Sequence, residues 1–239
     1  MTSHFEDCAE RFRQRLLDFV WSQWRVLGVA AATSSPLDWF IDPEPLIPFS
    51  LELARRDPRV FDEILDWLIR NGHWVNVRRM VSIVNADGVG EPNILRAVAK
   101  TVSDRSKAAP RWRFVDALAS SEAVGAQPLF LIAGKPWGAV AEPDEVFMEY
   151  GLKRSRVATR GMSVEVPMSD PRCAAFLMRS LFGVSARADV VCCLAIRGEG
   201  HPSGISRLLG YSQKQVQDTL VSMAGSQLVR TRRSGHRKN

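Results

Sequence analysis

Residues 187–239 carry the pattern that most constrains how this chain can fold. Two glycines and a proline separate an apolar segment from a short second segment, and Gly210-Tyr211-Ser212 separates the second from a third. Glycine tolerates the left-handed backbone found after a helix, whereas proline and serine favour helix starts. The pattern predicts three short helices joined by tight turns, which bury their apolar sides against one another.

Within these segments the apolar residues recur every three or four positions, as they do on one face of a helix. The first helix is expected from about Ala186 to Ile196, and the second begins at Pro202. Ser212 is expected to cap the third helix. The apolar sides of the second and third helices consist of Ile205, Leu208 and Leu209, and of Val216, Leu220 and Met223.

A basic hairpin is expected after the third helix. Leu228 to Arg232 is typical of a strand, Ser234-Gly235 of a turn, and His236 to Lys238 of the beginning of a return strand. The return strand is expected to be short, because the sequence ends at Asn239.

The three helices and the basic hairpin resemble the winged helix-turn-helix of the ArsR- and MarR-type bacterial transcriptional regulators. The resemblance covers about a fifth of the chain. It departs from the family pattern at Gln227, where a glycine usually stands directly before the Leu-Val of the wing. The resemblance implies that the third helix enters the major groove of double-stranded DNA and that the protein acts as a homodimer.

The resemblance also implies roles for individual side chains. Amides and a cation on the third helix suit the edges of DNA bases, and these side chains are Gln213, Lys214 and Gln217. The DNA backbone is expected to meet one hydroxyl and five cations, namely Ser212, Arg207, Arg230, Arg232, Arg233 and Arg237.

The distribution of charge favours the same function. From His201 to Asn239 the chain has seven Lys or Arg residues and one acid, so this stretch carries the whole net charge of +6. A localised basic patch is typical of a protein that binds a polyanion. Two alternatives stay open. A disordered basic tail gives the same charge pattern, and a winged helix can also be an adaptor or antitoxin-like protein that binds a protein partner.

The chain as a whole is expected to be mainly α-helical. We predict a helical domain over 1–125, a connecting segment over 126–168 and the winged helix-turn-helix over 169–239. Expected helices lie at 4–32, 49–56, 58–70, 111–120 and 142–152, with a proline-rich loop at 33–48 and a strand at 128–133. The helix at 4–32 belongs to a dimer interface or packs on its own domain. In the helix at 58–70, the acids Asp62, Glu63 and Asp66 are expected to face outward.

The sequence pattern of residues 68–102 is similar to that of the C-terminal region. In both places an apolar helix ends in arginine, a turn containing glycine and histidine follows, and later apolar residues have matching spacing. We interpret this as a second helix-turn-helix-like unit in the N-terminal half. If this unit binds DNA, its phosphate contacts are Arg78, Arg79, Arg96 and Lys100, although the acids nearby make it less suited to DNA.

The sequence contains no P-loop, no dinucleotide-binding glycine motif and no His-Glu-x-x-His. We therefore expect neither an enzyme nor a cofactor. The cysteines Cys8, Cys173, Cys192 and Cys193 form no Cys-x-x-Cys pair, so we expect thiols and no metal site. There is no run of eighteen apolar residues, and the acidic start is not a signal peptide. A cytoplasmic location is expected by default.

Overall fold

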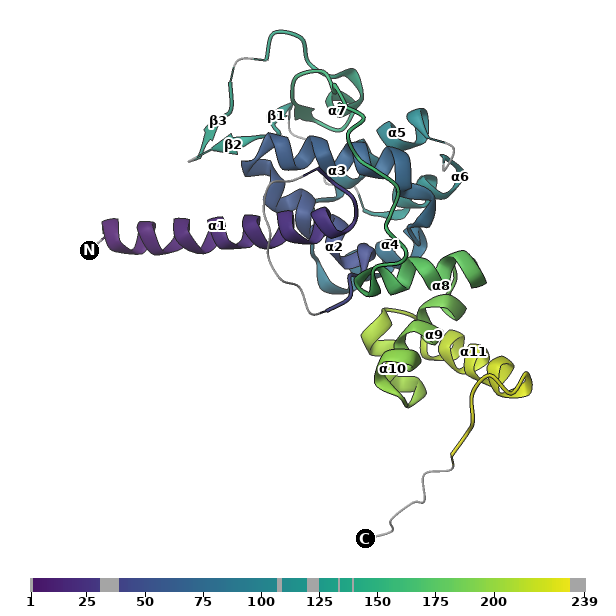
Figure 1. Ribbon diagram of the computed structural model, residues 1–239. Helices are drawn as coiled ribbons and strands as arrows, with labels where there is room; N and C mark the ends of the chain where they lie inside the picture. Colours follow the sequence, from purple (N-terminus) through teal and green to yellow (C-terminus); the bar gives the residue numbers. More distant parts are fainter. Residues whose placement is uncertain are drawn as a thin grey trace. The chain divides into compact units, whose positions relative to one another are not determined.

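The structure is a computed structural model that describes residues 2–30, 39–106, 109–119, 125–132, 134–138 and 140–232. The chain divides into two compact units, Met1–Leu177 and Met178–Asn239. Helices make up most of both units (Figure 1), so the expected mainly α class is confirmed. Among the described residues, no helix is long and apolar enough to cross a membrane.

Five longer helices form the frame of the first unit: α1 (Thr2–Val26), α2 (Pro43–Leu53), α3 (Pro58–Asn71), α4 (Val77–Asp87) and α5 (Pro92–Arg105). Shorter helical turns follow α2, α3 and α5: η1 (Ala54–Arg56), η2 (Gly72–Trp74), α6 (Ala109–Trp112) and η3 (Arg113–Ala117). Helix α3 begins at Pro58 because the side chain of Asp57 accepts the backbone N–H groups of Arg59 and Val60, as the sequence predicts. Its apolar side lies in the core of the unit.

Short strands and a short helix complete the first unit. They are β1 (Gln127–Pro128), β2 (Leu131–Ile132), β3 (Lys135–Pro136), α7 (Glu145–Glu149) and β4 (Leu152–Lys153). Strand β1 pairs in parallel with β4, and β2 pairs antiparallel with β3. The single strand expected at 128–133 is therefore two short strands, and residue 133 lies outside the described residues. The segment 126–168, expected to be a connection, contributes Leu129, Phe130, Phe147 and Val157 to the core of the first unit.

The proline-rich stretch before residue 49 was expected to be a loop, and this is wrong for its second half. Helix α2 already begins at Pro43, with Asp42 as its N-cap, and it includes Pro45 and Pro48. The first N–H groups of a helix have no partner inside the helix, so Pro43 and Pro45 lose no hydrogen bond. Only Pro48 removes one, and its side chain is buried.

The acids of α3 were expected to face outward, but Glu63 and Asp66 are buried. The extended segment after β4 covers this side of the helix. The carboxylate of Asp66 accepts the backbone N–H groups of Gly161 and Ser163, at 3.1 and 3.0 Å. Asp62 forms an ion pair with Arg154 at 2.7 Å. Asp62 and Asp66 therefore hold a segment that is distant in the sequence, and the expectation of outward-facing acids is wrong for Glu63 and Asp66.

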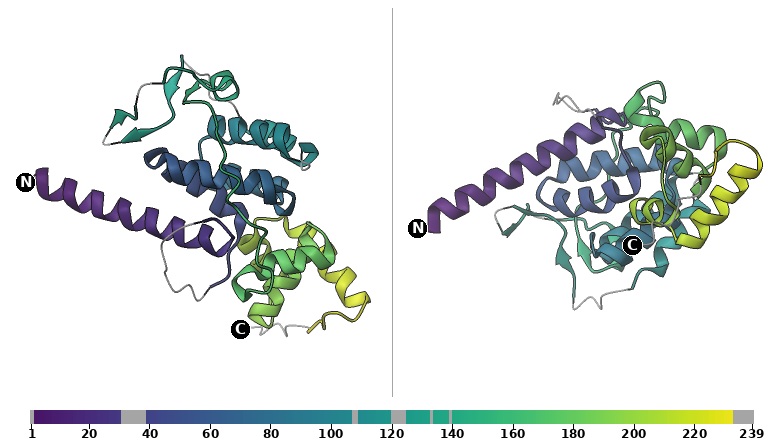
Figure 2. Two further views of the ribbon diagram at one scale, coloured as in Figure 1. Left: turned by 45° about the horizontal axis from the view of Figure 1, so that its top comes forward. Right: turned by 90° about the horizontal axis from the view of Figure 1, so that it is seen from below.

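Helix α1 packs on its own unit only at its C-terminal end. Val20 and Trp24 are buried, whereas Phe12 is 63% exposed. The first half of the helix projects beyond the other helices of the first unit (Figures 1 and 2). The helix ends at Val26, earlier than expected, because the chain turns at Gly28, whose φ of 102° suits glycine.

The second unit begins within α8 (Ala174–Phe182), which follows the turn η4 (Pro171–Cys173). It continues with α9 (Ala186–Arg197), α10 (Pro202–Leu209) and α11 (Gln213–Gly225), so the three predicted helices are confirmed. Most of the predicted apolar positions meet in one small core, whose buried members are Val190, Cys193, Ile205, Leu209, Val216 and Met223. Leu208 is an exception, because its side chain is exposed.

Candidate nucleic-acid interface

The turn between α10 and α11 has the geometry that its sequence predicts. Gly210 adopts the left-handed conformation, with φ of 68°, and ends α10. The hydroxyl of Ser212 accepts the backbone N–H of Gln215 at 3.2 Å and so caps α11. Helix α10 begins at Pro202, and Nδ1 of His201 accepts the N–H of Ser203. The turn between the two helices is therefore short: Gly210 ends α10, and Ser212 caps the start of α11.

A buried ion pair lies beneath this turn. Nε and Nη2 of Arg179 on α8 donate to Oδ1 of Asp189 on α9, at 3.0 and 2.9 Å. The hydroxyl of Tyr211 donates to the other oxygen, Oδ2, at 2.5 Å. Both charged side chains are almost completely buried. Charge-assisted hydrogen bonds are about twice as strong as neutral ones, so this cluster fixes the turn relative to α8 and α9.

The outward side of α11 carries the side chains that sequence analysis assigned to base edges. Gln213, Lys214 and Gln217 are exposed, so all three are accessible. Val221, which lies one turn beyond Gln217 on the same side, is 60% exposed. Val221 was not among the expected contact residues, although an apolar residue on the polar side of an amphipathic helix is a usable signal. Its side chain suits an apolar contact such as a thymine methyl group.

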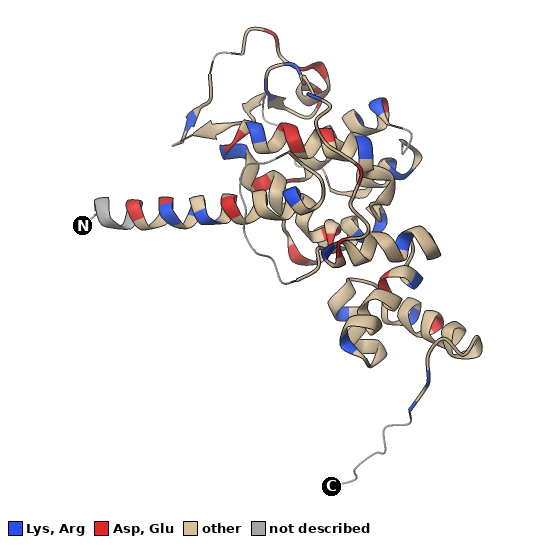
Figure 3. Ribbon diagram, in the orientation of Figure 1, with Lys and Arg blue, Asp and Glu red and all other residues tan. Residues whose placement is uncertain are grey.

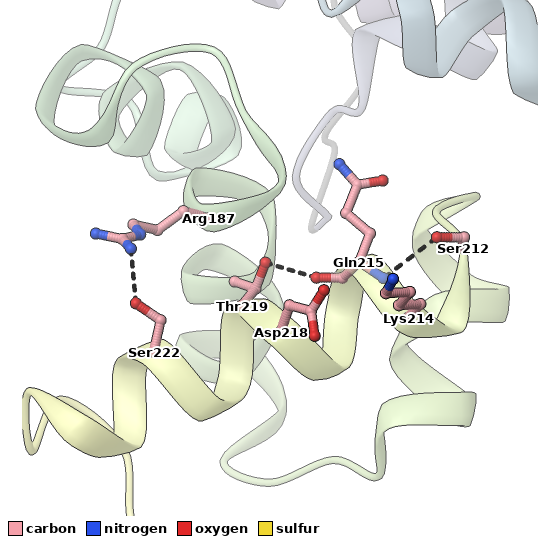
Figure 4. A pocket seen from close by; sticks show the side chains of 7 residues that line it. All are labelled: Arg187, Ser212, Lys214, Gln215, Asp218, Thr219 and Ser222. Atoms are coloured by element: carbon pink, nitrogen blue, oxygen red, sulfur yellow. Dashed lines mark hydrogen bonds between the residues drawn. The ribbon is translucent and has the colours of Figure 1, made fainter.

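A shallow depression runs along α11 beside these residues (Figure 4). Its lining includes Lys214 and Asp218, and also Arg187 from the beginning of α9. Nη2 of Arg187 donates to the hydroxyl of Ser222 at 2.9 Å, which holds this cation against α11. Arg187 was not expected at this surface, because it lies 35 residues from its partner and no local motif links the two.

The cations expected to meet the DNA backbone are exposed where the structure describes them. These are Arg207, Arg230 and Arg232; Arg233 and Arg237 lie outside the described residues. Nε of Arg207 donates to the carbonyl of Ser203, and Arg232 lies 4.0 Å from Glu199 at a highly exposed position. An exposed ion pair of this kind is weak, so Arg232 remains available to a phosphate. Figure 3 shows the basic residues along α9 to α11 and the segment after them.

The strand expected at 228–232 is wrong for the residues that the structure describes. Residues 226–229 form turns, and no residue of the described ranges pairs with 228–232 in a sheet. A strand needs a hydrogen-bonded neighbour, and the expected return strand from His236 lies outside the described residues. At Gln227, the position of the family's glycine, the chain has φ of 60°. Gln227 thus adopts the left-handed conformation that a glycine would favour.

The cations expected to contact phosphate in the N-terminal half are engaged within the first unit. Arg79 is buried and forms ion pairs with Asp42 and Glu44, so its assignment to phosphate is wrong. Arg78 stacks on Phe114, with its guanidinium carbon 3.9 Å from the ring centre. The two others bond inside the unit as well: Arg96 donates to the carbonyls of Asp116 and Leu118, and Lys100 pairs with Asp104.

The cysteines are free thiols in the structure. Cys8 is exposed, and the other three are buried. Burial raises the pKa of Cys173 to about 12, and burial also raises the pKa of Cys193. Among the residues described here, no three side chains of His, Cys, Asp or Glu come together in a way that could hold a metal ion.

Comparisons with protein-family models, with curated proteins and with solved structures gave no match to this chain.

Proposed function

We propose that this chain is a cytoplasmic bacterial transcriptional regulator that binds double-stranded DNA sequence-specifically through α9, α10 and α11. The observation that carries the proposal is the outward side of α11, where Gln213, Lys214 and Gln217 are exposed directly after a capped glycine turn. The major groove admits one α-helix, and its base edges offer the acceptors and donors that amides and a lysine pair with.

The residues proposed to contact phosphates lie before and after α11 in the sequence. Arg207 on α10 and Arg230 and Arg232 after α11 are exposed, and Arg233 and Arg237 continue the basic run in the sequence. The hydroxyl of Ser212 accepts one N–H as a cap and keeps its own hydrogen as a donor for a phosphate oxygen. These contacts orient the protein on DNA and carry little sequence information.

The regulator acts as a homodimer, because one module of this size covers too little DNA for high affinity. Helix α1 is the element that favours such a dimer. Phe12, on its projecting first half, and Phe19, further along the helix, are both exposed, and Phe19 stacks with the exposed ring of Trp39 at 6.0 Å between ring centres. An apolar helix face left in water is typical of a protein contact.

The proposal is tested by selecting bound duplexes from a random pool with the full-length protein. A sequence-specific regulator enriches one motif, and it binds that motif on the order of a thousandfold more tightly than a shuffled duplex. Fluorescence anisotropy at a fixed salt concentration measures both affinities. Recovery of no motif, together with equal affinity for both duplexes, contradicts sequence-specific binding.

A second candidate function is that of an adaptor or antitoxin-like protein that binds a protein partner. The observation that favours it is a set of exposed apolar side chains in the second unit, namely Leu181, Ile196, Leu208, Val221 and Leu228. Such side chains are more typical of a protein contact than of a phosphate-binding surface. If this function is the right one, a co-purifying protein raises the melting temperature and duplex DNA leaves it unchanged.

A further inference from the structure

The first unit contains a cleft that the proposed DNA binding does not use. It has a volume of about 610 Å³, within the range of small-molecule sites. One wall comes from the beginning of α3, and the others come from the chain around β1, β3 and β4. All of its lining belongs to the first unit, so it can be described without reference to the second.

The apolar part of the cleft is aromatic. Phe130 is a buried member of its lining, and Trp137, next to Pro136, is 56% exposed. A tryptophan left half in water next to a hollow leaves a large flat surface without a packing partner. Planar rings stack on such a surface, and base–aromatic stacking contributes about 1–3 kcal/mol.

The polar part of the cleft is cationic. Its lining includes Lys153, Arg154 and Arg156 but only one carboxylate, Asp62. Lys153 and Arg156 are exposed, so both are accessible to a ligand. The lining therefore favours an anion, and a group with two negative charges matches it better than a single carboxylate does.

Arg154 is the unusual member of this group, because its side chain is only 3% exposed. It lies among the rings of Phe61, Phe130 and Phe147, with its guanidinium carbon 5.1–5.6 Å from the ring centres. Its Nε donates to the carbonyl of Ser155, and Nη2 pairs with Asp62, but Nη1 has no hydrogen-bond partner among the described residues. Burying an N–H group without a hydrogen-bond partner costs free energy. An anionic ligand in the cleft would provide the missing acceptor.

Asp62 is the one carboxylate in this lining, and it is paired with Arg154. Burial raises the pKa of Asp62 above its ordinary value, even though the adjacent Arg154 lowers it. The ion pair with Arg154 therefore offsets only part of the free-energy cost of burying this carboxylate.

We propose that this cleft binds a nucleoside monophosphate, with the base stacked on Trp137 and the phosphate held by Lys153, Arg154 and Arg156. The ring surface and the cations lie in one cleft, and a mononucleotide carries a planar base and a dianionic phosphate in one small molecule. The site is independent of DNA binding by the second unit, so either proposal can fail without the other.

Isothermal titration of the full-length protein with AMP, GMP, CMP and UMP tests this site, with adenosine and inorganic phosphate as partial ligands. We expect saturable binding of at least one nucleotide and much weaker binding of both partial ligands. Trp137→Ala weakens binding about fivefold or more, from the loss of stacking. Arg156→Gln weakens it about tenfold, from the loss of a charge-assisted contact.

Both substitutions are at exposed positions, so the fold tolerates them. Matched controls are Trp39→Ala, which removes a 48% exposed tryptophan outside the cleft lining, and Arg105→Gln, which removes an exposed arginine of α5 outside it. Neither control changes nucleotide affinity. The proposal is overturned if no nucleotide binds at 5 mM, or if Trp137→Ala and Trp39→Ala affect binding equally.

Discussion

The hydroxyl of Tyr211 donates a hydrogen bond of 2.5 Å to Oδ2 of Asp189, whose other oxygen accepts Arg179. Tyr211 stands in the turn that precedes α11, and Asp189 lies on α9. The bond therefore ties the start of the proposed recognition helix to the helix behind it. A recognition helix can read bases only if its start is held in one position.

Removing this hydroxyl should destabilise the second unit. A hydrogen bond to a charged group contributes about 1.5–3 kcal/mol, and Tyr211→Phe leaves one oxygen of a buried carboxylate without this donor. The loss is measured by far-UV circular dichroism during thermal unfolding. All seven tryptophans lie between residues 21 and 137, so their fluorescence reports the first unit alone and should not change.

Tyr150→Phe is the matched control, because no hydrogen bond to its hydroxyl is found among the described residues. Tyr150 is the other tyrosine of the chain and lies in the first unit. If Tyr211→Phe and Tyr150→Phe leave the dichroism transition equally unchanged, the Asp189 cluster does not hold the turn.

Gln227→Gly should stabilise the second unit by about 0.5–1 kcal/mol. A non-glycine residue in the left-handed conformation costs about 1–2 kcal/mol, and the greater freedom of glycine in the unfolded chain offsets part of the gain. The same substitution at Gln217, inside α11, should instead destabilise by about 1 kcal/mol. Dichroism melting of both variants gives the comparison, and a loss of stability at Gln227 would disprove the left-handed turn.

Glu63→Gln should stabilise the first unit at pH 7. Burial raises the pKa of Glu63, so folding favours its protonated form, and the stability that this carboxyl contributes is lost as the pH rises through the folded pKa. Glutamine does not ionise, and the gain should vanish below about pH 4, where the wild-type carboxyl is protonated in both states. Urea unfolding, followed by tryptophan fluorescence at pH 7 and below about pH 4, measures this gain in stability.

The exposed Glu142 provides the control for this change. Glu142→Gln should leave the urea midpoint unchanged at both pH values. An equal effect of both substitutions, or a gain for Glu63→Gln at low pH only, would contradict the burial of Glu63.

Only one thiol of the native protein should react rapidly with iodoacetamide at pH 8. Cys8 is exposed, whereas the other three cysteines are buried and the pKa of Cys173 is about 12. Because the thiolate is the reactive form, Cys173 stays inert at this pH. Intact-mass measurement should find one adduct, which Cys8→Ser abolishes. Two rapid adducts in the native protein would show that the cores are more open than the structure has them.

Mutations should distinguish the residues that contact DNA bases from the residues that contact phosphates. Lys214→Ala combined with Gln217→Ala should reduce the affinity for the selected duplex by about tenfold or more and change the affinity for shuffled DNA little. Arg232→Ala should weaken binding to both duplexes by a similar factor. If both variants lose affinity equally on both duplexes, α11 is not the reading helix.

Local signals in the sequence predict the second unit well. Pro202, Gly210 and Ser212 act on the residues beside them, so both ends of α10 and the start of α11 follow from sequence alone. The strand at 228–232 could not be decided in this way, because it depends on a partner segment.

In the first unit the failures come from long-range pairs. Arg79 is buried because Asp42 and Glu44 lie against it, and they are 37 and 35 residues away. Asp66 faces inward because it accepts N–H groups from residues 95 and 97 positions later. Helical periodicity counts such side chains as solvent-facing, and only the tertiary fold supplies their partners.

The central claim, that the basic segment after α11 contacts DNA phosphates, is tested most directly by a salt series. Fluorescence anisotropy with a random duplex measures the affinity of the wild type and of two double variants. Arg230→Gln/Arg232→Gln removes two cations after α11. The control, Arg56→Gln/Arg105→Gln, removes the same charge at exposed positions of the first unit. We predict that the slope of log affinity against log salt falls by about 1.8 in the first variant, since each phosphate contact contributes about 0.9, and stays unchanged in the second. Equal slopes in all three proteins, or no binding at low salt, would contradict the claim.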